Sequence, residues 1–210
     1  MKSTSRVKNS LTQAIPFQKS FFSQHTLEVA KELIGAYLVH FTGSGVLAGR
    51  IVETEAYRQN DPASHSYRGL TPRNKHMFAA GGVAYVYFIY GMYNCFNVVT
   101  EPEGFGCAVL VRAVEPVENT EIMWSHRFPG KPFNADMLNR IANGPGKLCR
   151  AMNITGEHNG ADLSTGPLRV LKRTGGPAPR VSSSARVGIS RGQDLLWRFF
   201  DVESRAVSRQ

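Results

Sequence analysis

The sequence predicts an α+β fold: a single compact domain in which helices surround a curved, mainly antiparallel β-sheet. Short apolar stretches typical of strands alternate irregularly with short helical patterns, unlike the regular β-α-β succession that predicts a parallel sheet. The 210 residues suffice for one large domain, and the chain contains no internal repeat and no low-complexity linker. We therefore expect one domain over residues 21–205, preceded by a flexible basic arm at residues 1–20.

The amino-terminal half predicts one helix and one hairpin. The helix should begin at Thr26, whose hydroxyl can cap free amides, and stop at Gly35, which tolerates a left-handed backbone. Strands should follow at residues 37–42 and 46–57, because apolar and β-branched residues flank the turn signal Thr42-Gly43-Ser44-Gly45.

The middle of the chain predicts a second helix and a second pair of strands. Thr71-Pro72 is typical of a helix start, and Gly81-Gly82 should end that helix. Strands are expected at residues 83–90 and 93–100, with Gly91 allowing a tight turn between them.

The remaining elements follow from proline positions and apolar runs. A strand is expected at residues 107–113, and Glu115-Pro116 should start a helix that reaches about residue 126. Two more helices are expected at residues 135–142 and 145–152, and the carboxy-terminal third is rich in strand and turn signals.

The charge balance favours a polyanionic partner. The chain has 25 basic and 16 acidic residues, a net charge of +9 and an isoelectric point near 9.7. An isoelectric point above about 9 is typical of nucleic-acid-binding domains. We therefore expect nucleic acid to be the partner.

Other features of the sequence argue against metal-stabilised, disulfide-rich, membrane-spanning and secreted proteins. Cys95, Cys107 and Cys149 form no C-x-x-C pair, which argues against a zinc ribbon and a disulfide framework and fits a reducing compartment. No apolar run is long enough for a membrane span, and no apolar segment near the amino terminus resembles a secretory signal. We expect a bacterial cytoplasmic protein associated with the nucleoid, or a nuclear one if the source is eukaryotic.

Two carboxylates on a predicted strand are the strongest chemical signal. Glu53 and Glu55 are two residues apart, so their side chains should share a face, and Tyr57 joins that face if the strand stays straight. Burying a carboxylate among apolar residues is costly unless it is paired or used in chemistry. The structural alternative is an ion pair with Arg112, and residue type alone does not separate the two glutamates.

Aromatic residues crowd the segment from Tyr85 to Tyr93. Tyrosines at this density exceed what a strand core needs, and stacking of a nucleic-acid base on an aromatic ring contributes about 1–3 kcal/mol. His65 has no companion at metal-ligand spacing, so we expect no metal and no cofactor. The glycines around Pro145 precede a helix start whose free amides, with Lys147, would attract phosphate.

Several motifs stand in a fixed order along the chain. They are Glu53-Thr54-Glu55-Ala56-Tyr57, Ser64-His65-Ser66, Thr71-Pro72-Arg73-Asn74, the run from Tyr85 to Tyr93, the run from Val109 to Pro116, and Gly144-Pro145-Gly146-Lys147-Leu148-Cys149. Together they resemble the alkyladenine (3-methyladenine) DNA glycosylase family, from near Phe21 to about Phe200.

The resemblance implies a role for each matching residue. Glu55 would activate a water molecule that Arg112 and the backbone carbonyl of Val187 hold. Tyr57 on one side, and His65 with Tyr87 on the other, would sandwich an extruded base. The implied residues also include Asn97, which would crowd the 2-amino group of guanine, and the DNA contacts Tyr90, Met92, Tyr93, Arg73 and Lys147.

The resemblance also implies the reaction. The protein would be a monomeric, monofunctional glycosylase that flips alkylated or deaminated purines out of duplex DNA and hydrolyses the N-glycosidic bond. The implied lesions are 3-methyladenine, 7-methylguanine, hypoxanthine and ethenoadenine. Tyr90 would be the wedge that fills the space of the flipped nucleotide.

Two alternatives stay open at the level of sequence. A helix-hairpin-helix glycosylase would explain Gly144-Pro145-Gly146-Lys147 but requires a largely helical chain. A basic nucleic-acid-binding module without activity would make the carboxylates purely structural.

Overall fold

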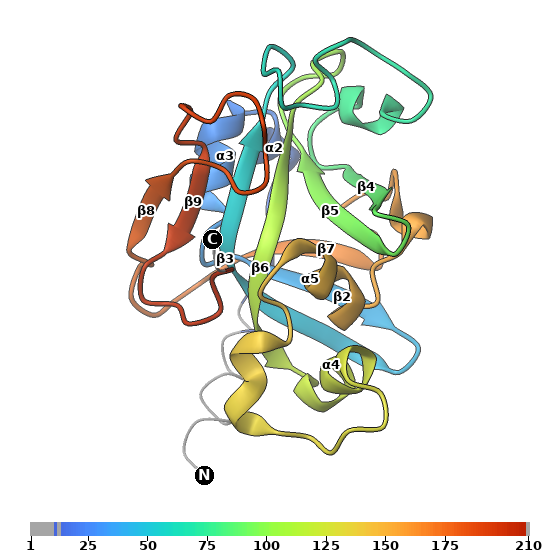
Figure 1. The fold of residues 1–210 in the computed structure, drawn as a ribbon, viewed down its shortest axis with the longest axis vertical. Coiled ribbons are helices and arrows are strands. Elements are labelled where there is room, and N and C mark those ends of the chain that lie inside the picture. The colour runs from blue at the N-terminus through green and yellow to red at the C-terminus, as the bar shows by residue number, and fades with distance from the viewer. Residues whose placement is uncertain (1–10, 12–13, 209–210) are drawn as a thin grey trace.

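The computed structural model describes residue 11 and residues 14–208 (Figure 1). Most of the expected basic arm, residues 1–10 and 12–13, lies outside this described part. From Ile15 onward the chain belongs to the fold: the first short strand pairs with a later one, and the rings of Phe17 and Phe21 stack with centroids 3.9 Å apart. The expected boundary at residue 21 stays a prediction.

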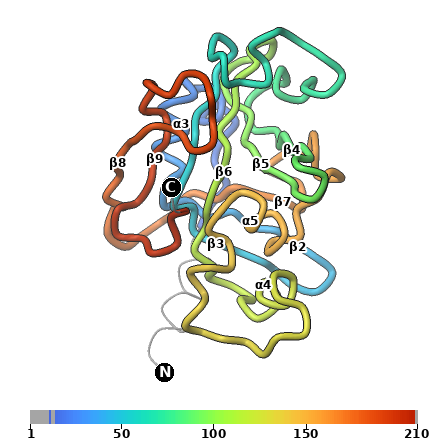
Figure 2. Tube along the Cα trace, in the orientation of Figure 1, coloured from blue at the N-terminus to red at the C-terminus, as the bar shows by residue number. Residues whose placement is uncertain are grey.

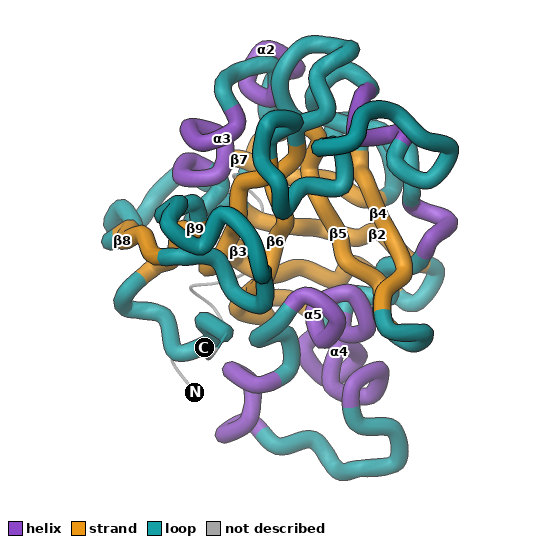
Figure 3. The backbone as a smooth tube through the Cα atoms, turned by 45° about the horizontal axis from the view of Figure 1, so that its top comes forward, coloured by secondary structure: helices purple, strands orange, loops and turns teal. Residues whose placement is uncertain are grey.

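A curved antiparallel sheet forms the centre of the molecule, as predicted. Its strands are β1 (Ile15–Pro16), β2 (Tyr37–Thr42), β3 (Gly45–Tyr57), β4 (Ala84–Ile89), β5 (Tyr93–Val99), β6 (Ala108–Glu118), β7 (Leu168–Lys172), β8 (Val181–Ser184) and β9 (Arg198–Asp201). Their order is β1-β7-β2-β3-β6-β5-β4, with β9 and then β8 attached to β3, and every pairing among these strands is antiparallel. Figure 3 shows how strongly the strands curl.

The curl of the sheet follows from the long strand β3, which pairs with different strands along its length. Its first half, up to Arg50, pairs with β2, whereas Glu53, Thr54 and Glu55 pair with β9 on the same edge. The opposite edge pairs with β6 over nearly its whole length, with register shifts around Glu53. Such bulges increase the local twist and bend the strand. The bent part of the strand carries both candidate carboxylates.

Short helices cover the sheet. They are α2 (Lys19–Phe22), α3 (Thr26–Glu32), α4 (Thr120–Arg127), α5 (Pro145–Ala151) and the 3₁₀ helices η1 (Lys75–Phe78), η2 (Ala135–Arg140) and η3 (Gly156–His158). α3 packs against β3 and β9, whereas α5 packs against β5 and β6 and supports α4 (Figure 1). The predominance of strands is incompatible with the helix-hairpin-helix alternative.

One predicted helix boundary was wrong. Pro116 does not start a helix but pairs with Gly49 inside β6, next to a register shift. A proline is tolerated there because β5 pairs only with the first residues of β6, which leaves the other edge of this part of β6 outside the β5 ladder. The helix begins instead at Thr120, after Asn119 has taken a left-handed conformation with φ of 49°.

Two predicted capping details also differ. The Thr71 segment forms a turn in which Thr71 and Asn74 exchange side-chain bonds to backbone N–H groups, and the 3₁₀ helix η1 starts only at Lys75. The cap of α3 is His25, whose ring accepts from the Leu27 N–H. Thr26 is buried and its hydroxyl donates to Glu101 over 2.5 Å. The Thr26 hydroxyl therefore binds the buried Glu101 carboxylate and, contrary to the sequence prediction, does not cap the helix.

A pair of histidines, the buried His40 and the half-buried His158, joins β2 to η3. The Nε2 atoms of His40 and His158 are 3.0 Å apart, and His40 Nδ1 lies 2.7 Å from the carbonyl of Met152. Since a carbonyl only accepts, His40 Nδ1 carries the hydrogen and His40 Nε2 accepts from His158. His158 Nδ1 then accepts from the Thr155 N–H. In this arrangement His40 is a neutral ring, since its Nε2 accepts a hydrogen bond.

We expect the protein to lose stability as the pH falls below about 6.5, the ordinary pKa of histidine. Burial, with the neighbouring His158 and His126, lowers the pKa of His40 from 6.5 in the folded state. The unfolded chain then binds more protons than the folded one between the two pKa values, so acid favours unfolding. Thermal unfolding near pH 7.5 and pH 5.5, roughly bracketing that value, measures the effect.

The matched variant is His40→Asn, whose amide can still donate to the Met152 carbonyl. It should unfold at temperatures that depend less on pH than those of the original protein. An unchanged pH dependence would show that His40 does not contribute.

Candidate active site

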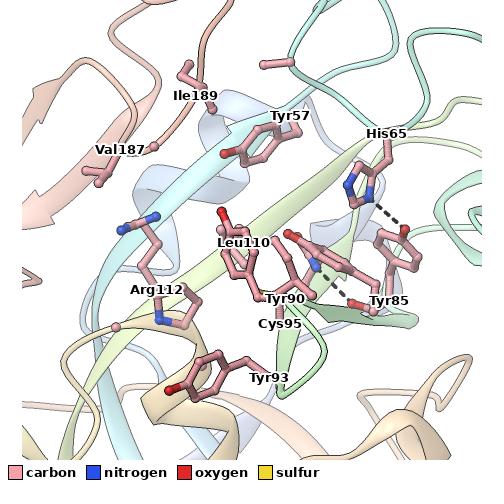
Figure 4. Close-up of a pocket in the computed structure, with 18 of the residues that line it drawn as sticks. Tyr57, His65, Tyr85, Tyr90, Tyr93, Cys95, Leu110, Arg112, Val187 and Ile189 are labelled. Carbon is pink, nitrogen blue, oxygen red and sulfur yellow. Dashed lines mark hydrogen bonds between the residues drawn. The ribbon is translucent and has the colours of Figure 1, made fainter.

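A cavity of about 510 Å³ opens where several separate parts of the chain meet. The end of β3, the β4–β5 hairpin, the start of α5 and the loop around Val187 form its walls (Figure 4). This volume lies within the range of small-molecule sites, roughly 300–1,000 Å³. Its lining contains most of the residues that the sequence motifs single out, namely Tyr57, His65, Tyr87, Tyr90, Tyr93, Asn97, Arg112, Lys147 and Val187.

The aromatic wall is built from β4 and the loop after β3. The ring of His65 meets that of Tyr87 edge-on, with centroids 4.5 Å apart, and Tyr85 lies 5.4 Å from Tyr87. His65 Nδ1 is 2.9 Å from the Tyr85 hydroxyl, a bond that fixes the plane of the imidazole (Figure 4). Tyr57 also lines the cavity, so flat aromatic surfaces are available for a planar ring.

The electrostatics of this wall keep it uncharged. Burial raises the pKa of Tyr85 to about 12, against a small opposing effect of Arg73. Burial also lowers the pKa of His65, and the positive charge of Arg73 lowers it further. His65 is therefore neutral at physiological pH. The wall can form hydrogen bonds without contributing a charge.

The floor of the cavity is mixed. Asn97 is buried, and its amide donates to the Tyr85 carbonyl over 3.0 Å, which fixes its orientation. Leu110 and Cys95 supply apolar contacts beside it. Burial raises the pKa of the Cys95 thiol, although its bond to Tyr87 opposes the shift, so the thiol is protonated.

Glu55 lies directly behind this cavity. Its side chain is fully buried and accepts three hydrogen bonds: from the Val187 N–H at 2.7 Å, the Tyr57 hydroxyl at 2.8 Å and Arg112 Nη1 at 3.2 Å. Each of the three donors lines the cavity, whereas Glu55 does not. Three hydrogen-bond donors therefore stand between the Glu55 carboxylate and the cavity.

Arg112 connects the two glutamates. It lies in β6 at the register shift between Ala113 and Val111, where it has no direct partner on β3. From there Nε donates to Glu53 over 3.0 Å while Nη1 reaches Glu55. Burial alone would lower the pKa of Arg112, but the charges of Glu55 and Glu53 outweigh it and raise the pKa. The predicted ion pair is thus present, with both carboxylates.

Glu53 differs from Glu55 in its surroundings. Besides Arg112, it accepts from Arg198 Nε at 2.6 Å and from the backbone and hydroxyl of Ser208 at 2.7 and 2.8 Å. None of these further donors belongs to the cavity wall. Glu53 therefore holds the site together from behind, and Glu55 is the carboxylate next to the cavity.

Arg186 is a buried cation that the sequence gives no reason to single out. It forms an ion pair with Asp61 and donates to the Ala56 carbonyl over 2.9 Å. Its guanidinium carbon lies 4.6 Å from the centre of the Tyr57 ring and 5.2 Å from that of Trp197. The residue before Val187 thereby fastens the carboxy-terminal loop to the end of β3 and supports the Tyr57 ring.

The tip of the β4–β5 hairpin projects from the surface. Tyr90 and Gly91 follow each other with φ of 53° and 66°, and the Met92 N–H returns to the Ile89 carbonyl over 3.3 Å. Consecutive left-handed residues are typical of a type I′ turn, and this conformation is strained for a tyrosine. Tyr90 is 82% exposed and Met92 is 66% exposed. The tight turn predicted at Gly91 is confirmed, and it directs Tyr90 outward.

Several basic residues lie in the cavity lining or near it. Lys147 lines the cavity at the start of α5, and its Nζ donates to Asn143. Burial and the nearby charges of Arg127 and Arg140 lower the pKa of Lys147. Arg73 is exposed and outside the cavity lining, as is Met92. A second hollow of about 500 Å³ shares His65 with the cavity and adds two exposed arginines, Arg68 and Arg191.

Within the described part of the chain, no three His, Cys, Asp or Glu side chains gather in a way that could hold a metal ion. Among the same residues, no helix is both long and apolar enough to cross a membrane. The cysteines are free and buried.

Comparison with known proteins gives one consistent result. A family model described as methylpurine-DNA glycosylase matches residues 20–205. A protein of Methanocella arvoryzae is 48% identical over 198 residues, which cover 91% of this chain and 95% of that protein. Relatives from Methanoculleus marisnigri (46% over 194 residues; 91% and 97% covered) and Chlorobium phaeobacteroides (46% over 192 residues; 90% and 94% covered) are similar. All three relatives are provisionally named 3-methyladenine DNA glycosylases.

The fold, the cavity and these similarities define the class: this is a DNA glycosylase, a hydrolase of base excision repair that acts on DNA. The chain belongs to the methylpurine-DNA glycosylase family. The resemblance of the sequence motifs to that family is thereby confirmed.

Proposed function

We propose that this enzyme flips alkylated or deaminated purines out of duplex DNA and hydrolyses their N-glycosidic bond with a water molecule activated by Glu55. The candidate bases are 3-methyladenine, 7-methylguanine, hypoxanthine and ethenoadenine. The observation that carries the proposal is the position of Glu55, held by Arg112 and the Val187 N–H directly behind a cavity with aromatic walls.

The exposed hairpin supports the flipping step. A base inside the duplex hides its glycosidic bond, and extruding it costs a few kcal/mol. A side chain that fills the vacated space offsets part of this cost. Tyr90 is the most exposed large hydrophobic side chain among the described residues, and its strained turn points it away from the core. Met92 and Tyr93 on the same hairpin would contact the neighbouring bases.

The aromatic wall supports recognition of the extruded base. Tyr57 would stack on one face of the base, and His65 with Tyr87 on the other. Asn97 would crowd a 2-amino group, because its amide is fixed by the Tyr85 carbonyl. Such a contact favours bases without that group, among them hypoxanthine.

The chemistry needs a negative charge beside C1′. The C1′–N bond breaks, its electron pair leaves with the base, and positive charge develops on the sugar. The water oxygen then bonds to C1′ and its proton passes to Glu55, which also stabilises the sugar cation. Since the Tyr57 hydroxyl occupies one oxygen of Glu55, we propose that base entry displaces this bond and that water takes its place. Arg112 and the Val187 carbonyl would hold the water.

The positive surface would bind the DNA backbone around the flipped nucleotide. Lys147 lines the cavity, Arg73 is close enough to influence His65 and Tyr85 in its wall, and Arg68 and Arg191 line the adjoining hollow. Contacts of this kind weaken as salt concentration rises, because counterions return to the phosphates. We propose that a monomer suffices, in the bacterial cytoplasm at the nucleoid or, for a eukaryotic source, in the nucleus.

The test is incubation of the protein with methylated duplex DNA, followed by chromatographic analysis for free base. We expect release of 3-methyladenine and 7-methylguanine, and duplexes with single hypoxanthine or ethenoadenine residues extend the test to the other bases. Binding without base release would instead favour the non-enzymatic module.

Lys147 gives the same experiment a second readout. An amine with a lowered pKa at the cavity could attack C1′ and form a Schiff base, as in glycosylases that also cleave the strand. We expect no covalent adduct after borohydride treatment during turnover, because the proposed nucleophile is water. A trapped adduct that Lys147→Arg removes would overturn the monofunctional mechanism.

A further inference from the structure

The last described residues of the chain return to the centre of the sheet. Figure 2 shows the carboxy-terminal trace beside β9 and β3. Ala206 is fully buried and packs with Val52 of β3, which a register shift leaves without a partner on β6, and with Ala113 of β6, the partner of Glu53. Ser208 is buried as well. This segment therefore lies against the backbone positions that aim Glu53 and Arg112.

Ser208 is bonded to three charged side chains at once. Its hydroxyl donates to Glu53 Oε1 over 2.8 Å and accepts from Arg112 Nη2 over 3.3 Å. Its backbone N–H donates to Glu53 Oε2 over 2.7 Å, and its carbonyl accepts from Arg198 Nη2 over 3.2 Å. Both termini of the Arg112 fork are therefore held, one by Ser208 and the other by Glu55.

We infer that Ser208 is a positioning residue for base excision. The inference rests on the proposed roles of Glu55 and Arg112. Ser208 does not reach the cavity. It acts through Arg112, whose Nη1 remains beside Glu55 only while its Nε and Nη2 are held from behind.

The position calls for a group that donates and accepts at the same time. A hydroxyl does both, whereas a methyl group does neither. Replacing Ser208 with alanine would leave Arg112 Nη2 without this acceptor and Glu53 Oε1 without one donor. An unsatisfied buried polar group is unfavourable, so the Arg112 guanidinium would turn toward other acceptors and away from the Glu55 carboxylate.

The test compares Ser208→Ala with Ser204→Ala in single-turnover excision from methylated duplex DNA. Ser204 lies in the same terminal segment; its hydroxyl donates to Glu115 over 2.6 Å and accepts from the Ala206 N–H over 3.1 Å, so its loss also measures any general loosening of the segment. Glu115 pairs with Arg50 and does not contact Arg112 or Glu55, so Ser204→Ala removes a comparable bond outside the proposed network.

We expect Ser208→Ala to slow excision at least about tenfold, the change that about 1.4 kcal/mol of lost transition-state stabilisation produces. Its affinity for lesion-containing DNA should stay the same. Ser208→Thr, which retains the hydroxyl, should restore the rate, and Ser204→Ala should excise at the original rate.

Equal rates for Ser208→Ala and Ser204→Ala would overturn the inference, as would a rate loss that only accompanies lower thermal stability and weaker DNA binding. Both results differ from failure of the proposed function itself. In that case the unsubstituted protein would release no base, and the comparison of variants would not arise.

Discussion

Glu55→Gln should abolish measurable base release and leave the affinity for lesion-containing DNA unchanged. Glutamine keeps the size of the side chain and can still accept from the Val187 N–H, so the cavity should persist. It carries no charge, however, and cannot take a proton from water or stabilise a sugar cation. General base catalysis contributes about 10²–10⁴-fold, and we expect a loss of at least this size in the single-turnover rate.

Glu53→Gln is the isosteric control for this experiment. The neutral amide would leave Arg112 and Arg198 without their shared carboxylate, and breaking a buried ion pair by removing one partner costs about 3–5 kcal/mol. Among the described residues Glu55 pairs only with Arg112, which keeps Glu53 as a partner when Glu55 is replaced, whereas Glu53 serves two arginines. We therefore expect a lower unfolding temperature for both variants, with the larger decrease for Glu53→Gln. Full activity of Glu55→Gln would move the chemistry to Glu53 and contradict the proposed mechanism.

Tyr90→Ser should weaken base flipping without destabilising the fold. The side chain is 82% exposed, so its removal leaves no cavity in the core. Without the wedge, the space that the flipped nucleotide leaves in the duplex would stay empty. The flipped state would then be less favourable, by up to a few kcal/mol. We expect at least about a tenfold loss in excision, and a smaller fluorescence change from a reporter base placed at the lesion.

Phe41→Ser provides the comparison for Tyr90→Ser. Phe41 is an aromatic residue that is 42% exposed on β2, outside the cavity lining. Its loss should leave flipping and excision unchanged. An unaltered reporter signal in Tyr90→Ser would show that the tyrosine is not the wedge.

Much of the fold could be predicted because its signals are local. Turn residues and alternating apolar positions set the β2–β3 and β4–β5 hairpins, and the strand ends differ from the prediction by about one residue. The helix predicted from Pro116 failed because pairing with β3 stabilises this segment as a strand. The preference of proline for a helix start reflects local backbone geometry only. It carries no information about pairing with a strand that is distant in sequence.

The candidate site likewise has one part that the sequence predicts and another that depends on contacts between distant residues. The spacing of Glu53, Glu55 and Tyr57 and the run of tyrosines identified the part of the chain that forms the cavity. Tyr85 was among these tyrosines, but its bond to His65 joins two separate elements and had no sequence signal. Arg186 was missed because its partners, Asp61 and Trp197, are brought together only by folding.

The sequence by itself determined the fold class, the family and the motif to which we assign the chemistry, because these depend on residue types and short spacings. Only the tertiary structure decided which glutamate lies next to the cavity. The Val187 N–H that binds Glu55 is 132 residues away in sequence, and the Ser208 N–H that binds Glu53 is 155 residues away. Two carboxylates on one strand look equivalent until distant parts of the chain supply different hydrogen-bond donors to each.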